Sequence, residues 1–80
     1  MHAIAPVSVW ETISRSRTLT DVEGASRWLL DRWPAGTAKP KSYPKALRAC
    51  LAALDGSSTV ESARAALIEV ADEAGILDRA

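Results

Sequence analysis

The chain has a single cysteine, Cys50, which excludes an intrachain disulfide and a cysteine-rich zinc site. It has no phenylalanine and only three tryptophans and one tyrosine, so aliphatic side chains and alanine must form most of the core. The longest apolar run, residues 49–54, is too short to cross a bilayer. The first residues lack the basic start and apolar run of a signal peptide. We therefore expect a cytoplasmic protein without a membrane-spanning segment.

The charged residues balance but are unevenly distributed. The 80 residues include 10 basic and 10 acidic side chains, and 48% of them are hydrophobic, as in an ordinary globular domain. Eight of the basic residues lie in positions 1–48, whereas six of the acidic ones lie in positions 49–80. A chain divided in this way can attract its own other half or a second copy. The division makes nucleic acid an unlikely partner, since proteins that bind nucleic acids usually carry one basic surface.

Residues 6–13 alternate between apolar and polar side chains, which predicts a half-buried strand. The predicted inward side chains are Val7, Val9 and Ile13, and the outward ones are Ser8, Trp10 and Thr12. Residues 14–16 are suited to a turn, and residues 17–20 would return as a second short strand. A two-stranded ribbon is not stable alone, so it must pack against helices.

Three helices are predicted after this hairpin. A capping box at Thr20–Glu23 starts a helix that runs to about Trp33, where Pro34 ends it. Apolar side chains at helical spacing mark a second helix, from a cap at Ser42 to the break at residues 55–56. A second capping box, at residues 58–61, starts the last helix, which runs to about residue 74. The predicted fold is a single α+β domain over residues 1–80, with an ordered core at about 6–76, mobile termini and the order ββααα.

Several short motifs occur along the chain: Pro6-Val7-x-Val9, Arg17-x-Leu19, Val22-Glu23-x-Ala25, Trp33-Pro34, Tyr43-x-x-Ala46-x-x-x-Cys50, Ala53-Leu54-x-Gly56 and Glu61-x-Ala63-Arg64-x-Ala66-Leu67-Ile68. Together they resemble a family of small bacterial proteins catalogued as a domain of unknown function, number 982. The resemblance covers roughly residues 6–76, and one departure is Leu67, where the family often has phenylalanine. It implies a compact bacterial, cytoplasmic domain, and it implies no activity, cofactor or catalytic residue.

Candidate interface residues come from the predicted outer face of the hairpin and from the first helix. Trp10 stands among the polar residues Ser8 and Thr12, and Trp28 lies at the flank of its helix. Exposed tryptophans often contribute much of the energy of an interface. The alternative is that residues 4–5 or 76–77 cover Trp10. Trp33 continues the inner stripe of its helix and is expected in the core.

Four basic residues are candidates for an anion site. Lys41, Lys45 and Arg48 fall on one face of the middle helix, and Arg64 lies at the edge of the inner stripe of the last helix. A solvated outer face is the commoner explanation for the first three. Arg64 can instead pack its stem on the core and bond a carboxylate or carbonyl.

Catalytic chemistry finds little support in the sequence. Cys50 lies inside an apolar helix stripe, where free cysteines act as small hydrophobes, and the only histidine is His2. No set of residues has the spacing of a metal site, and we expect no cofactor. The leading hypothesis is a non-catalytic protein-interaction or self-associating module that uses the hairpin edge and Trp10, with an unknown protein or a second copy as partner. The alternative is a module that binds an anion, a nucleotide or a nucleic-acid backbone through the basic stripe.

Overall fold

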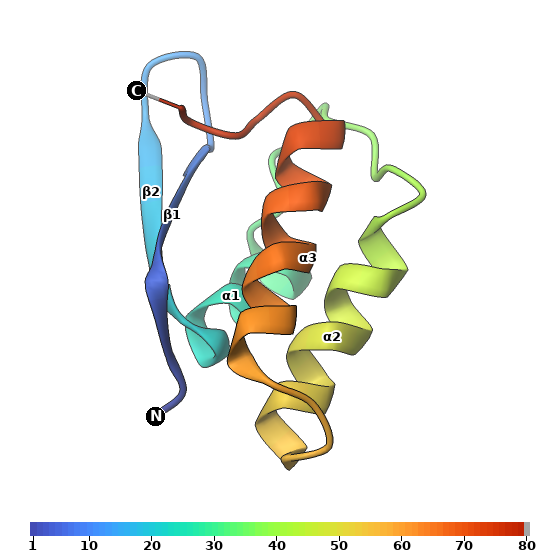
Figure 1. The fold of residues 1–80 in the computed structure, drawn as a ribbon. Coiled ribbons are helices and arrows are strands. Elements are labelled where there is room, and N and C mark those ends of the chain that lie inside the picture. The colour runs from blue at the N-terminus through green and yellow to red at the C-terminus, as the bar shows by residue number, and fades with distance from the viewer. Residues whose placement is uncertain (80) are drawn as a thin grey trace.

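A computed structural model describes residues 1–79 and confirms the predicted architecture. The hairpin strands are β1 (Ala3–Trp10) and β2 (Ser16–Asp21). The helices are α1 (Val22–Asp31), α2 (Tyr43–Asp55) and α3 (Val60–Glu73), as Figure 1 shows. Within the described range, none of the helices is both long and apolar enough to cross a membrane.

The first strand begins and ends earlier in the chain than the alternating pattern predicts. β1 starts at Ala3, and its pairing with β2 is irregular between Ala3 and Val7. Pro6 lies in this stretch, and proline has no N–H to give to a strand ladder, so an irregularity is tolerated there. β1 ends at Trp10, and the amides of Glu11 and Thr12 both donate to the Arg15 carbonyl in the loop that follows. The alternation therefore stops before Ile13.

The predicted inward position of Ile13 is wrong for this reason. Its side chain is 101% exposed, at the tip of the hairpin. Val7 and Val9 do face inward, as predicted, and Leu19 of β2 is buried with them.

The N-caps of α1 and α3 lie one residue after their predicted positions, whereas Ser42 is the N-cap of α2, as predicted. The N-cap of α1 is Asp21, whose carboxylate accepts from the Gly24 amide at 2.6 Å. Thr20 is exposed, and Glu23 binds His2 instead of completing a capping box. Strand β2 ends at Asp21 and α1 begins at the next residue, Val22, so Asp21 occupies the N-cap position. The prediction of Thr20 as the cap is therefore wrong. In α3 the cap is Thr59, which accepts from Ser62.

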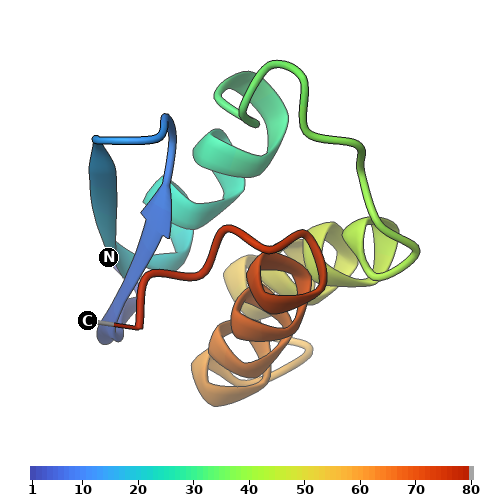
Figure 2. The ribbon, with the colours of Figure 1, turned by 90° about the horizontal axis from the view of Figure 1, so that it is seen from above.

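The elements form three layers around one core (Figure 2). α1 packs on β2 and α3 packs on β1, while α2 packs on the far side of these two helices. Small side chains let α2 and α3 lie close together, among them Ala46, Ala53, Ala63 and Ala66. Larger buried side chains come from β1, α1 and α3, so the helices hold the hairpin by its inner face.

Trp28 is more buried than predicted, and Trp33 is less buried than predicted. Trp28 is only 1% exposed, so its assignment to a surface flank is wrong. α1 is covered on two sides, by the hairpin and by the other helices, and its buried face is therefore broader than one stripe. Because α1 ends at Asp31, Trp33 does not continue the helix stripe, and it is half-buried in the connection to α2.

The segment after α3 lies along the outer edge of β1. The Trp10 amide donates to the Ile76 carbonyl at 2.7 Å, and the Asp78 amide donates to the Ser8 carbonyl at 2.9 Å. Leu77 forms an isolated bridge with Val9. Figure 2 shows this segment running beside β1. Hydrogen bonds of the backbone therefore reach from His2, whose carbonyl accepts from the Val22 amide, to Asp78.

Candidate functional site

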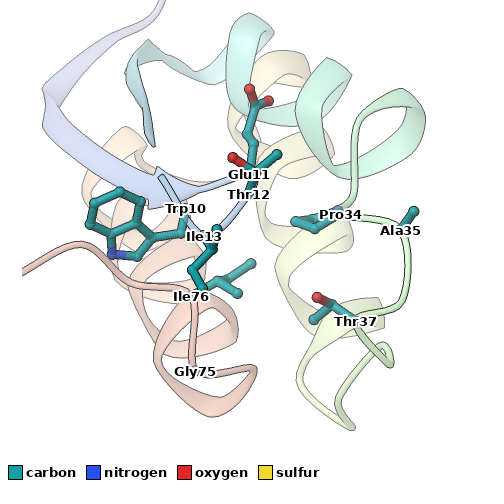
Figure 3. A pocket seen from close by; sticks show the side chains of 9 residues that line it. All are labelled: Trp10, Glu11, Thr12, Ile13, Pro34, Ala35, Thr37, Gly75 and Ile76. Atoms are coloured by element: carbon teal, nitrogen blue, oxygen red, sulfur yellow. The ribbon is translucent and has the colours of Figure 1, made fainter. Parts of the chain in front are cut away.

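An open groove of about 440 Å³ lies at the end of the molecule where the hairpin turns. Three segments that are distant in sequence form it: the hairpin tip, the start of the α1–α2 connection and the turn after α3. We call it the tip groove. Figure 3 shows Ile13 and Ile76 on one side of it and Pro34, Ala35 and Thr37 on the other.

Backbone hydrogen bonds hold the hairpin side of the tip groove. The bond from the Trp10 amide to the Ile76 carbonyl joins the end of β1 to the turn after α3. That turn depends on Gly75, whose φ of 74° lies in the left-handed region that glycine adopts without strain. Glu11 is paired with Arg17 at 2.7 Å, which ties the loop back to β2. This side of the groove is therefore fixed in place.

An aromatic cluster holds the opposite side. The rings of Trp28, Trp33 and Tyr43 pack in a row, with centroid separations of 5.3 and 5.4 Å. The Trp33 indole N–H donates to the Thr37 carbonyl at 2.7 Å. The Tyr43 hydroxyl donates to the Leu29 carbonyl at 2.7 Å, which fastens the start of α2 to α1. The connection that carries Pro34 and Thr37 is thus anchored at both ends.

The groove is mainly apolar and has an exposed isoleucine at its rim. Ile13 is fully exposed, whereas Ile76 is 8% exposed and Pro34 is buried. Glu11 is the one charged side chain in the lining, and its carboxylate is paired with Arg17. An exposed aliphatic side chain beside an apolar groove has the chemistry of a protein contact surface.

The four predicted interface residues do not lie together. Trp10 and Thr12 line the tip groove, and Trp10 is half-buried against the core. The interface role of Trp10 stays a prediction. Ser8 lies further along β1, where its hydroxyl is 2.9 Å from that of Thr18. Trp28 is in the core, so it is unavailable to a partner.

Sequence reasoning missed three side chains of this groove. Ile13 was assigned to the inner face, and neither Pro34 nor Ile76 was considered a site residue. An isolated isoleucine followed by the polar turn residues 14–16 is the one local signal that marks Ile13 as a tip residue. Pro34 and Ile76 reach the groove only through tertiary packing, which no local pattern records.

The four predicted anion-binding residues are separated in the fold. Lys45 is paired with Glu69 of α3 at 3.1 Å. Arg64 donates from Nε to the Ala5 carbonyl of β1 at 3.0 Å, on another face of α3. Arg48 is exposed on α2, but Lys41 is exposed two residues before the helix begins, so its predicted place on that helix is wrong. The structure therefore does not bring the four residues together.

The thiol of Cys50 and the imidazole of His2 are not in contact. Cys50 is fully buried, as predicted, and this burial raises the pKa of its thiol, which the neighbouring Ser26 hydroxyl only partly offsets. His2 is bound to Glu23 through its ring at 2.7 Å and through its backbone amide at 3.0 Å. These hydrogen bonds lower the pKa of Glu23 to about 2. Among residues 1–79, no three potential ligand side chains are grouped to hold a metal ion.

Comparison with known proteins agrees with the family resemblance seen in the sequence. The family described as "Protein of unknown function (DUF982)" matches residues 5–78, nearly the whole chain. No curated protein and no solved structure matches the chain significantly. The extent of the family match shows that this chain belongs to the DUF982 family of proteins of unknown function.

Proposed function

We propose that this chain is a non-catalytic protein-interaction module that associates with a second copy of itself through the tip groove. The single observation that supports this proposal is the fully exposed Ile13 at the rim of an apolar groove. Burying an isoleucine side chain contributes about 1.5–3 kcal/mol, so its exposure in a small domain favours a partner.

The partner we favour is a second copy because the patch is self-complementary. A two-fold interface uses the same surface on both subunits, so each copy must provide both a projecting group and a recess. Ile13 projects, and the space between Ile76 and Pro34 is the recess beside it. Trp10 and Thr12 would lie at the margin of the contact, where a half-buried tryptophan adds apolar area.

The alternative of an anion-binding module has less support. Lys45 and Arg64 already have partners at 3.1 and 3.0 Å. Of the remaining cations, Lys41 is exposed in the turn before α2, and Arg48 is exposed on α2, where charged side chains commonly face solvent. The anion site therefore stays a prediction that no observation favours.

Sedimentation of the purified chain over a range of concentrations tests the proposal. We expect concentration-dependent dimerisation, and we expect Ile13→Ser to weaken it at least about tenfold, as for a central interface residue. Trp10→Ala should weaken it less and leave the helical circular dichroism unchanged. The matched control is Leu51→Ser, which removes a leucine that is 49% exposed on α2, away from the groove. A wild-type chain that stays monomeric at high concentration, or an Ile13→Ser variant that dimerises normally, would contradict the proposal.

A further inference from the structure

Strand β2 forms a free edge of the hairpin. The sheet has two strands, and the segment after α3 lies only along β1 (Figures 1 and 2). Thr18 and Thr20 of β2 are both exposed. Unpaired strand edges readily accept another extended chain, and native proteins usually protect them. This edge therefore needs an explanation.

The hydrogen bonds of β1 show which of its residues direct their backbone N–H and C=O groups away from β2. The Ser8 carbonyl accepts from the Asp78 amide, and the Trp10 amide donates to the Ile76 carbonyl. Residues of an antiparallel ladder alternate between the two sides, so Ser8 is not hydrogen-bonded to β2 through its backbone. Side chains of such a pair lie close together, in agreement with the 2.9 Å between the hydroxyls of Ser8 and Thr18.

The same alternation identifies the outward groups of β2. Thr18 lies opposite Ser8, and Leu19 lies opposite Val7. The backbone N–H and C=O of Leu19 therefore point to β1, whereas those of Thr18 point outward. With a period of two, Thr20 points outward as well. A free donor and acceptor thus repeat along this edge.

Two arginines lie beside this edge without a partner. A groove of about 310 Å³ runs between β2 and α1, and Arg27 and Arg32 line it. Both are exposed, and neither side chain has a hydrogen bond or ion pair within residues 1–79. The carboxylates of the same groove are occupied, since Asp21 caps α1 and Glu23 binds the N-terminal histidine. The groove therefore presents two available positive charges.

We propose that the free edge of β2 binds an extended acidic segment of another protein as an added strand. Its backbone would bond to Thr18 and Thr20, in the mode known as β-augmentation. Alternate side chains of the added strand would point to the α1 side of the sheet, so carboxylates at every second position would reach Arg27 and Arg32. A second copy of this chain fits poorly, because pairing two β2 edges would bring the arginines of both copies to the same junction. This surface is separate from the tip groove, and either can fail without the other.

Titration of the isotope-labelled chain with synthetic peptides tests the inference. The probe is a short peptide that alternates glutamate with valine. Its controls are the same peptide with lysine for glutamate and a peptide of equal composition with all glutamates adjacent. We expect NMR shift changes concentrated at residues 16–20, and an affinity at least about tenfold higher than for either control. Equal binding of the three peptides, shift changes elsewhere only, or no change at millimolar glutamate peptide would overturn the inference.

Two sets of variants separate the backbone from the charges. Thr18→Pro removes the outward N–H and leaves the bonds between β1 and β2 in place, since proline is tolerated on a free edge. It should reduce affinity at least about tenfold, whereas Thr18→Ala, which keeps the N–H, should reduce it less than about threefold. Arg27→Glu and Arg32→Glu should each reduce affinity about fivefold to tenfold, and Arg48→Glu on α2 should have no effect. Full binding by Thr18→Pro, or an equal loss in Arg48→Glu, would refute the mode of binding.

Discussion

The two edges of the hairpin differ in what covers them. The edge of β1 is closed by the chain's own C-terminal segment, whose hydrogen bonds to Ser8 and Trp10 measure 2.9 and 2.7 Å. Among the described residues, the edge of β2 is open and lies beside Arg27 and Arg32, which have no partners there. A small domain has too few strands to protect every edge, so the edge left open is a natural place for a partner.

The covered edge also shapes the tip groove. The segment that closes β1 carries Ile76, which is buried and forms part of the groove lining. Ile13 extends beyond the last covered residue of β1 and stays exposed. The segment that covers the edge of β1 therefore forms the recess of the tip groove at Ile76. The hairpin loop beyond β1 provides the projecting side chain of Ile13.

The largest expected effect comes from breaking the closed edge. Ile76→Ala removes a buried side chain from the covering segment, and it should reduce the free energy of unfolding by about 2–4 kcal/mol. Urea denaturation followed by tryptophan fluorescence measures this loss. The matched control, measured at a concentration at which the chain is monomeric, is Ile13→Ala, because Ile13 is fully exposed and its loss should change monomer stability by less than about 0.5 kcal/mol. Equal effects of the two variants would mean that the C-terminal segment does not hold β1.

A smaller effect on stability is expected at the junction of β2 and α1. Asp21→Ala removes the cap that accepts from the Gly24 amide, and it should cost about 1 kcal/mol of stability. Thr20→Ala should cost less than about 0.5 kcal/mol, because Thr20 is exposed and makes no cap. Thermal denaturation of both variants measures the difference, and a larger loss for Thr20→Ala would move the cap back to the position predicted from the sequence.

The smallest effect concerns the start of β1, which is fastened to α1 by Glu23 and His2. Hydrogen bonds from His2 lower the pKa of Glu23 from its ordinary value of 4.5 to about 2. A carboxyl with a depressed pKa stabilises the folded state above pH 4.5 and loses that contribution as the pH falls toward 2. The wild type should thus lose more stability than Glu23→Gln between these pH values. Because the pair is exposed, salt should reduce the difference, and melting curves at several pH values measure it. Parallel acid profiles of the two proteins would show that this contact contributes nothing.

The order of the elements was predictable because local patterns determine it. Alternating valines mark β1, and apolar residues at helical spacing mark α2. The errors fall where tertiary contacts override the pattern. Trp28 is buried because two layers cover α1, and Ile13 is exposed because the hairpin loop begins one residue after Trp10.

The candidate site was only partly predictable for the same reason. Trp10 and Thr12 were identified as surface residues of the hairpin, and both line the tip groove. The recess itself depends on Pro34 and Ile76, which lie far from the hairpin in sequence. The cover of β1 was predictable only as an alternative, in which residues 76–77 lie over Trp10, because the bridge between Val9 and Leu77 depends on tertiary packing.

Amide hydrogen exchange measured by NMR tests the contrast between the two edges most directly. The amides of Trp10 and Asp78 are bonded across the covered edge and should exchange slowly, whereas those of Thr18 and Thr20 should exchange at nearly the rate of an unstructured chain. Slow exchange at Thr18 together with fast exchange at Trp10 would contradict the account, because it would place the free edge on the other strand.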